Sequence, residues 1–298
     1  MKSMFVNEIK GKKYIESTFM IVKILSKDDE RTVAYIGDKT GDVKANIPDP
    51  KKELRIGDVI KVKGEMDSVL VVSSFKKVKN YDLLDYIQSS KRPTEDMIKE
   101  LEILSDESFK SKEVIALNDY FFKDSAFLEK FKMSIGGLKQ HHNYLGGLVE
   151  HTLNVMYLSK VYAERYSCEH KEIAILGAKL HDIGKIEEYF TKGPFETTTR
   201  GEMEGHIVIG VEMLEEAFRD GGNIYSEEFK LRMKGCIIQH HGKVEYGSPK
   251  EPRTEEAFIV HLADYVDAIM SKIEQIKDVT NEGEWSEYDR RIGTRIWR

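Results

Sequence analysis

The chain has 298 residues, more than the commonest single-domain size of about 100 to 150 residues, so two domains are expected. Its apolar runs are far shorter than the roughly 20 residues that cross a bilayer, and Cys168 and Cys236 are too few for a disulfide framework or a cysteine metal cluster. We therefore expect a cytoplasmic protein without a membrane partner. The net charge is −6, yet residues 1–90 carry 17 Lys and Arg against 14 Asp and Glu, so the amino-terminal part is the basic one.

This amino-terminal part has the pattern of a small antiparallel sheet, because short apolar or alternating runs are separated by turn signals. The predicted strands cover residues 14–25, 31–38, 42–48, 58–65 and 68–78. The run DKTGD at 38–42 predicts a tight hairpin, and GDVIKVKG at 57–64 predicts a strand that follows a turn. These two runs resemble segments of OB-folds. We therefore expect a five-stranded OB-fold barrel over residues 1–85.

OB-folds commonly bind oligonucleotides, although a small barrel can also serve as a docking module. Single-strand binding combines cations along the backbone with rings on which bases stack. The candidate cations are Lys23, Arg31, Lys44, Lys61, Lys63, Lys76 and Lys77, and the candidate rings are Tyr14, Phe19, Tyr35 and Phe75. Some of these rings must belong to the core. We predict that the domain binds nucleic acid, with Lys61 and Lys63 among the substrate contacts.

After residue 85 the alternation stops, and apolar residues recur at three and four positions, as in helices. The predicted helices cover residues 94–104, 110–122, 125–131, 146–166, 169–184, 204–219, 226–241 and 253–274. We therefore expect a multidomain protein of the α and β class, in which the barrel precedes an all-α bundle over residues 86–276. Residues 277–298 are polar and charged and are predicted to form a carboxy-terminal tail.

All nine histidines lie between His141 and His261, in the helical part. Four segments place nitrogen and oxygen ligands where core residues would otherwise stand: 150–152 (EHT), 180–185 (LHDIGK), 239–242 (QHHG) and 261–264 (HLAD). A single histidine is more often a hydrogen-bonded core or surface residue than a ligand. Imidazoles and carboxylates together are the ligands of first-row divalent ions, so the joint pattern predicts a metal site.

The order His, His-Asp, Asp over about 115 residues resembles the HD-domain superfamily of metal-dependent phosphohydrolases, in a match over roughly residues 140–270. The resemblance implies that the first ion is held by His151, His181, Asp182 and Asp264. It also implies a second ion at His206 together with His240 or His241, with Asp182 as the bridge between the two. Lys185 matches the lysine of the HD-x-x-K variant, which is suited to hold a phosphate oxygen. His142 is a candidate for substrate contact, while His141 and His261 stay unassigned.

A closer resemblance lies in the runs QHHNYLGGLVEHT at 140–152 and HHGKVEYGSP at 240–249, which are similar to signature segments of YhaM-type 3′-to-5′ exoribonucleases. Proteins of that family join an OB-fold to an HD domain in this order. The chain departs from the pattern at Gly136–Lys139, where the family has A-A-K, and at Tyr246, where it has tryptophan. Neither departure touches a metal ligand, so they bear on substrate preference.

The resemblance implies a metal-dependent exoribonuclease that cleaves single-stranded RNA, or single-stranded DNA, to nucleoside 5′-monophosphates, with catalytic Asp182 and Lys185. Two ions are expected, with Mn before Fe, Co or another first-row metal, and a homo-oligomer is left open. One alternative is an HD-domain enzyme acting on nucleotides or cyclic nucleotides, with a regulatory barrel. The other is a nucleic-acid-binding protein with a structural metal site.

Overall fold

The computed structural model describes residues 2–138 and 142–298. These residues form two compact units. One holds the described residues up to Ser89 together with Phe190–Glu196, and the other holds Ser90–Tyr189 and Thr197–Arg298. None of the helices in the described part of the chain combines the length and the apolar character that a membrane crossing requires.

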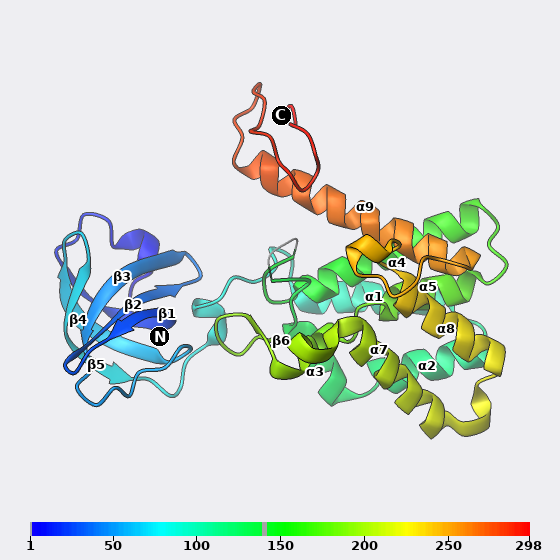
Figure 1. Cartoon of the computed structure of the whole chain (residues 1–298), viewed down its shortest axis with the longest axis horizontal. Coiled ribbons are helices and arrows are strands. Elements are labelled where there is room, and N and C mark those ends of the chain that lie inside the picture. The colour runs from blue at the N-terminus through cyan, green and yellow to red at the C-terminus, as the bar shows by residue number, and fades with distance from the viewer. Residues whose placement is uncertain (1, 139–141) are drawn as a thin grey trace. The chain divides into compact units, whose positions relative to one another are not determined.

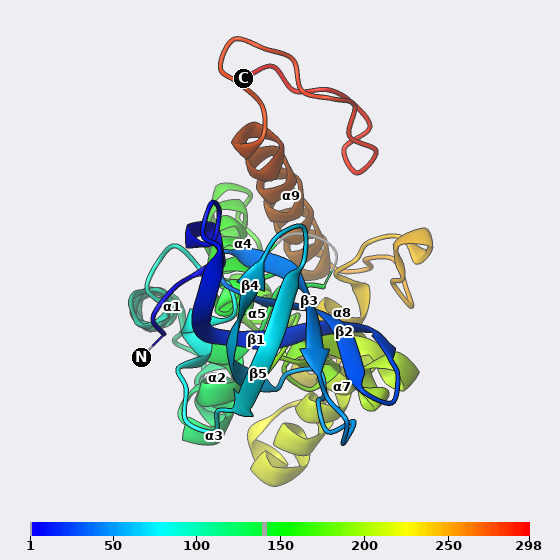
Figure 2. The ribbon, with the colours of Figure 1, turned by 90° about the vertical axis from the view of Figure 1, so that its left-hand side faces the viewer.

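The first unit is a closed barrel of five strands in the order β1-β2-β3-β5-β4, drawn in blue to cyan in Figures 1 and 2. The strands are β1 (Tyr14–Lys27), β2 (Arg31–Asp38), β3 (Gly41–Pro48), β4 (Val59–Met66) and β5 (Leu70–Lys77). The long β1 closes the barrel because its first half pairs with β4 and its second half with β2. A short parallel pairing of β3 with β5 completes the ring. The predicted OB-fold barrel is confirmed.

The core of the barrel follows the two-residue period of its strands. Buried residues alternate with exposed ones, and the core includes Ile15, Phe19, Ile36, Ile47, Ile60, Val62 and Leu70. The predicted hairpin forms between β2 and β3, where Asp38 Oδ1 accepts hydrogen bonds from the amide and the hydroxyl of Thr40. Asp38 Oδ2 accepts from the amide of Val6, and this fastens the residues before β1 to the hairpin.

The second unit is a bundle of helices. They are α1 (Thr94–Ser108), α2 (Lys112–Phe122), α3 (Ser125–Met133), α4 (Gly147–Arg165), α5 (Lys171–Leu180), α6 (Lys185–Glu188), α7 (Thr199–Gly221), α8 (Glu227–Gln239) and α9 (Glu255–Asp278).

Short elements occur in both units. Two-residue strands, β6 (Tyr189–Phe190) and β7 (Glu196–Thr197), pair with each other between α6 and α7. Short 3₁₀ turns lie at Val6–Glu8, Leu83–Asp85, Gly222–Ile224 and Val244–Tyr246.

Helix α5 is the centre of this bundle and packs against α4, α8 and α9. Its residues Ile173–Leu180 are all buried, as expected for a helix surrounded by others. Three helices of this unit begin at a polar residue whose side-chain oxygen accepts a hydrogen bond from an otherwise unpaired amide of the first turn. The caps are Thr198 for α7, Ser226 for α8 and Thr254 for α9.

Helix α9 runs past the ends of the other helices of its unit, and the last residues of the chain lie at its far end (Figures 1 and 2). This final segment is not extended, since isolated bridges join Trp285 to Trp297 and Asp289 to Thr294. The guanidinium of Arg298 donates to the carbonyl of Thr280 and ties the segment to the end of α9. The predicted tail is therefore partly helical at its start and folded back on itself afterwards.

Candidate metal centre

Five helices bring the predicted ligands together inside the second unit. His151 lies in α4 and Asp264 in α9, while His181 and Asp182 directly follow α5. His206 lies in α7, and His240 and His241 directly follow α8. The side chains of His151, His181, Asp182 and His240 are almost fully buried. His141 lies outside the described residues.

The first group of ligand atoms surrounds the Nε2 atom of His151. This atom lies 3.1 Å from Nε2 of His181, 3.3 Å from Oδ2 of Asp182 and 3.3 Å from Oδ1 of Asp264. Nε2 of His181 is also 3.2 Å from Oδ2 of Asp182. Four nitrogen and oxygen atoms of the type that binds first-row metals thus lie close together, three of them on buried residues and the fourth on the partly buried Asp264.

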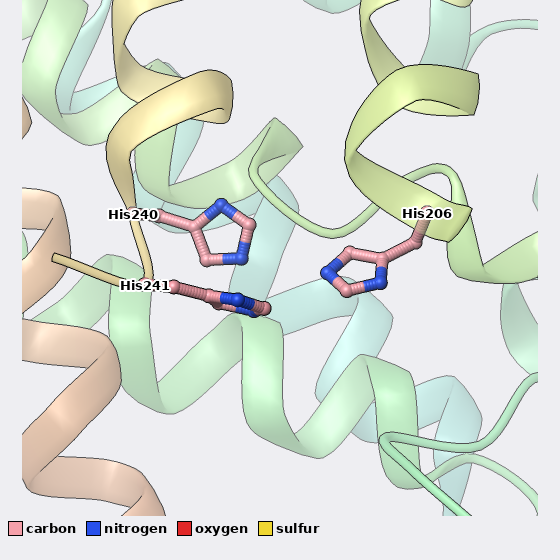
Figure 3. Close-up of side chains that lie close together, drawn as sticks. All are labelled: His206, His240 and His241. Atoms are coloured by element: carbon pink, nitrogen blue, oxygen red, sulfur yellow. The ribbon is translucent and has the colours of Figure 1, made fainter. Parts of the chain in front are cut away.

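The second group lies on the other side of Asp182. Its second oxygen, Oδ1, is 3.4 Å from Nε2 of His206 and 3.6 Å from Nε2 of His240. His206, His240 and His241 each offer a nitrogen within 4.8 Å of the others. Figure 3 shows the three rings pointing toward one another, His240 and His241 from one side and His206 from the other. Asp182 therefore presents one oxygen to each group.

The second group contains buried polar atoms without a hydrogen bond to the described residues. They are Oδ1 of Asp182, Nε2 of His206, Nε2 of His240 and Nδ1 of His241. A buried polar atom left unpaired costs roughly 1 to 3 kcal/mol, and four in one place call for a common partner. Because a carboxylate and imidazole nitrogens are all donors of electron pairs, a divalent cation fits this set.

The far sides of the imidazoles are hydrogen-bonded in the way that metal ligands require. Nδ1 of His181 donates to the carbonyl of Ala178 at 2.7 Å, and Nδ1 of His240 donates to the carbonyl of Ile237 at 2.7 Å. Each histidine thus ends its helix by turning its ring back on the carbonyl three residues earlier. With the proton on Nδ1, the lone pair is on Nε2, which faces the centre.

The electrostatics of the centre favour an ionised Asp182 and neutral rings at His240 and His241. Burial would raise the pKa of Asp182, but Lys185 and His181 outweigh burial and hold this pKa well below its ordinary value. Burial lowers the pKa of His240 well below its ordinary value. Burial, aided by His206, lowers the pKa of His241 to about 4. At neutral pH, His240 and His241 therefore keep lone pairs available for a cation.

Lys185 lies inside the centre rather than on its rim. Its Nζ donates to Oδ2 of Asp182 at 2.5 Å and to the carbonyl of Gly136 at 2.7 Å. A backbone turn before α6, in which the amide of Lys185 donates to the carbonyl of Asp182 at 3.0 Å, places the two side chains on the same side. The arrangement sets a positive charge beside the carboxylate that both groups share.

Two glycines shape the backbone around His206. A Cβ on Gly184 would lie 2.0 Å from the carbonyl oxygen of His206, so only glycine lets the turn after Asp182 approach α7 this closely. Gly205 has φ of +72°, which kinks α7 directly before His206. The kink points the amide of His206 at Glu188, which accepts from it at 3.2 Å.

Two carboxylates behind the ligands are absent from the sequence prediction. Glu188 lies 3.2 Å from Nδ1 of His206, and Asp267 lies 2.7 Å from Nδ1 of His151. Asp267 also contacts His142 Nε2 at 3.0 Å, so His142 lies beside the first group. His261, left unassigned by the sequence, bonds through Nδ1 to the carbonyl of His240 at 2.8 Å and supports the turn there.

The predicted substrate contacts of the barrel are exposed but paired. Lys61 and Lys63 on β4 contact the carboxylate of Glu16 on the neighbouring β1, at 2.9 and 3.2 Å. Among the candidate rings, Phe19 is a core residue, while Tyr14 is 68% exposed. Tyr35 and Phe75 are half-buried.

The chain is similar to known proteins in both its units. The HD domain family matches residues 148–269. A protein from Shouchella clausii named 3′-5′ exoribonuclease YhaM is 30% identical over 89% of this chain and 85% of its own length. Proteins of the same name from Bacillus subtilis and a Geobacillus strain are 29% and 28% identical, each over 84% of this chain and over 82% and 79% of their own lengths. No solved structure matches the chain significantly. An identity of 30% across most of both chains, with an HD domain at the buried centre, shows that this chain belongs to the 3′-5′ exoribonuclease YhaM family.

Proposed function

We propose that the chain is a metal-dependent 3′-to-5′ exoribonuclease that hydrolyses single-stranded RNA to nucleoside 5′-monophosphates in the cytoplasm. One observation carries the proposal. The buried carboxylate of Asp182 stands between two groups of ligand atoms and turns one oxygen to each. A carboxylate between two cation sites is the arrangement of two-metal phosphodiesterases.

The donor set suits two divalent first-row ions, with Mn the first choice and Fe or Co as alternatives. His151, His181, Asp182 and Asp264 would hold one ion. His206, His240 and His241 would hold the other, with Asp182 shared. When bound, such a pair supplies a nucleophile at neutral pH and positive charge near the leaving oxygen.

Hydrolysis forms a bond between phosphorus and the oxygen of water and breaks the bond between phosphorus and the 3′ oxygen of the penultimate nucleotide. That 3′ oxygen takes up a proton, and the terminal nucleotide leaves as a 5′-monophosphate. Lys185 has the charge and the place to stabilise the phosphate, because its ammonium lies beside Asp182 and is held there by the hydrogen bonds that it donates to Asp182 and to the carbonyl of Gly136. Lys185 and His181 hold the pKa of Asp182 well below its ordinary value, so the carboxylate is negatively charged at neutral pH.

The barrel contributes strand binding in this proposal. Lys61 and Lys63 lie on an exposed face where backbone phosphates can reach them, and Tyr14 offers an exposed ring. Single-stranded DNA could contact the same cations and rings. We propose RNA as the substrate because the YhaM relatives are named as exoribonucleases.

The test compares substrates of different length and kind with purified protein and Mn²⁺. An exoribonuclease should release nucleoside 5′-monophosphates from a 20-nucleotide RNA and leave a cyclic nucleotide and a free nucleoside monophosphate intact. Faster turnover of the cyclic nucleotide or of the monophosphate than of the RNA would contradict the proposal and favour a nucleotide phosphohydrolase. Binding of RNA without cleavage of any substrate would favour a binding protein with a structural metal site.

A further inference from the structure

Asp267 is a buried carboxylate whose two oxygens are both occupied. It lies in α9, one helical turn after Asp264, and is 6% exposed. Its Oδ2 is 2.7 Å from Nδ1 of His151 and 3.0 Å from Nε2 of His142. Its Oδ1 accepts from the side-chain amide of Asn154 at 2.8 Å. The residue therefore joins α9 to α4 and to the loop before α4.

The contact with His151 decides which nitrogen of that ring faces the centre. Asp267 accepts the proton on Nδ1 of His151, so Nε2, which lies beside Asp182 and Asp264, is the nitrogen whose lone pair would be offered to a cation in the first group. His181 and His240 obtain the same orientation from backbone carbonyls, which no substitution can remove. The orientation of His151 depends on a side chain instead.

The contact of Asp267 with His142 holds the loop before α4 against the metal centre. His142 has φ of +55°, which is an uncommon conformation for a residue with a side chain and costs of order 1 kcal/mol or more. Its carbonyl accepts from the amide of Gly136 at 2.9 Å, and the carbonyl of Gly136 accepts from Lys185. The described ends of the loop are thus fastened to Lys185 at one point and to Asp267 at the other.

We propose that Asp267 is a positioning residue of the active site, which fixes the imidazole of His151 toward the first ion and holds His142 beside it. The inference rests on the proposed two-ion function and deepens it, because each ion would have one carboxylate behind a histidine ligand: Asp267 for the first ion and Glu188 for the second. Glu188 stands behind His206 of the second group in the same way that Asp267 stands behind His151 of the first. The two residues therefore make a matched pair of controls.

The test is equilibrium binding of Mn²⁺ to the full chain, with free Mn²⁺ counted by electron paramagnetic resonance. The wild type should bind two ions. Asp267→Asn keeps the size of the side chain but removes its charge. It should weaken the binding of one Mn²⁺ ion by about 10- to 100-fold and leave the affinity for the other ion unchanged. Glu188→Gln should weaken the binding of that other ion by a similar factor.

A double-mutant cycle separates positioning from a general loss of structure. If Asp267 acts through His151, then Asp267→Asn should cost little further Mn²⁺ affinity in a His151→Ala background, whereas a purely structural residue would give additive losses. Should Asp267→Asn fail to fold, Asn154→Ala replaces it, because it removes one hydrogen bond to Asp267 and leaves both imidazole contacts. This variant should lower the affinity for the same Mn²⁺ ion by about threefold.

The outcomes also distinguish the inference from the function on which it rests. Two Mn²⁺ ions bound by the wild type and bound equally tightly by Asp267→Asn would overturn the role of Asp267 alone. A wild type that binds no Mn²⁺ would instead overturn the proposed two-ion function. Selective loss of one ion in Asp267→Asn and of the other in Glu188→Gln supports the assignment.

Discussion

Lys185 is the residue whose charge the proposed chemistry uses most directly. The ammonium of Lys185 is buried and is held in place by the hydrogen bonds that it donates to Asp182 and to the carbonyl of Gly136. Lys185→Gln should therefore lower kcat by about 10²- to 10³-fold, the usual cost of losing one donor to a transition state. KM should change little, since the barrel and the ions still hold the strand. Single-turnover cleavage of labelled RNA measures the effect.

Lys185→Arg is the matched variant, because it keeps the positive charge but not the compact shape of the ammonium. Its kcat should lie between those of the wild type and of Lys185→Gln. A Lys185→Gln enzyme with wild-type kcat would show that this charge has no part in the reaction.

Gly184 tests how closely the turn after Asp182 must approach α7. A methyl group there would meet the carbonyl of His206 at 2.0 Å and the amide of Gly210 at 2.8 Å, so Gly184→Ala must displace α7. We expect a loss of about 1 to 3 kcal/mol in the free energy of unfolding and weaker binding of the ion at His206. Thermal unfolding and Mn²⁺ titration measure the two effects.

Gly235→Ala in α8 is the control, since the nearest atom to its added methyl group is the flexible end of Gln239 at 3.5 Å. This variant should be as stable as the wild type or more so, because alanine favours a helix over glycine by about 1 kcal/mol. Equal stability and equal metal binding in both variants would refute the argument from close approach.

The sequence could predict the set of candidate ligands because four segments of the helical part combine histidines and carboxylates, and the structure brings these residues together. It missed Asp267 and Glu188, because one acidic residue on a helix carries no signal of its own. The spacing held a clue in each case. Asp267 stands three residues after Asp264, and Glu188 stands three after Lys185, so each shares a helix face with a proposed site residue. The sequence left His240 and His241 as alternatives, whereas the structure turns both rings toward His206.

At the scale of elements, Asp49 holds the loop after β3 against the barrel. The residue is 1% exposed and accepts hydrogen bonds from the Thr32 hydroxyl and from the amides of Glu53 and Leu54. Asp49→Ala leaves these three donors without this acceptor and should cost about 2 to 4 kcal/mol of barrel stability. Hydrogen exchange of the barrel amides measures this local cost.

The contribution of Asp49 to stability should depend on pH. Burial would raise the pKa of Asp49, but the hydrogen bonds from Glu53, Thr32 and Leu54 outweigh burial and lower this pKa. The resulting stabilisation is fully present above the ordinary carboxylic acid pKa of about 4 and is lost as the pH falls through the lowered pKa. The difference in stability between the wild type and Asp49→Asn should therefore shrink below about pH 4.

Asp29→Ala is the matched control for Asp49, because the side chain of Asp29 is 97% exposed and its ion pair is with the half-exposed Lys52. Its effect should stay within about 0.5 kcal/mol. A loss in Asp29→Ala as large as that in Asp49→Ala would contradict the role given to burial.

Most strands and helices could be predicted because their apolar residues repeat every two or three to four positions. The differences arise where other forces decide. The predicted helix 169–184 ends at Leu180, since His181 turns back on the carbonyl of Ala178. Helix α7 begins at Thr199, five residues before the predicted start, because the side chain of Thr198 caps it and Gly205 is accommodated as a kink. The two-residue strands β6 and β7 are too short for any periodicity to reveal.

At the scale of the whole molecule, the barrel is expected to bind the strand that the helical unit cleaves. Lys61 and Lys63 share one carboxylate, Glu16, so the face carries a single net positive charge from these three residues. Replacing both lysines by alanine should weaken binding of a 20-nucleotide RNA by about tenfold and reduce the slope of log affinity against log salt by about 1.4. Cleavage of a dinucleotide should not change.

Glu16→Ala is the opposite variant, because it frees both lysines from their shared partner. It should tighten binding of the long RNA and steepen its salt dependence. If the two variants moved the affinity in the same direction, or if neither moved it, this face of the barrel would not be the RNA-binding face.

The order of the two units could be predicted from the sequence, since the change from a two-residue period to a helical one is abrupt near residue 85. The assignment of Phe190–Glu196 to the barrel unit could not, because a short segment between helices carries no period that links it to a distant sheet.

The most direct test of the central claim is a time course of 5′-labelled single-stranded RNA with Mn²⁺, run beside the Asp182→Asn variant. Asn cannot supply two charged oxygens to two ions, while its size preserves the fold. With the wild type we expect a ladder of products that shorten from the 3′ end, and with the variant we expect this shortening to be at least about 10³-fold slower. A wild type that leaves the strand intact, or a variant that shortens it at the wild-type rate, would contradict the account.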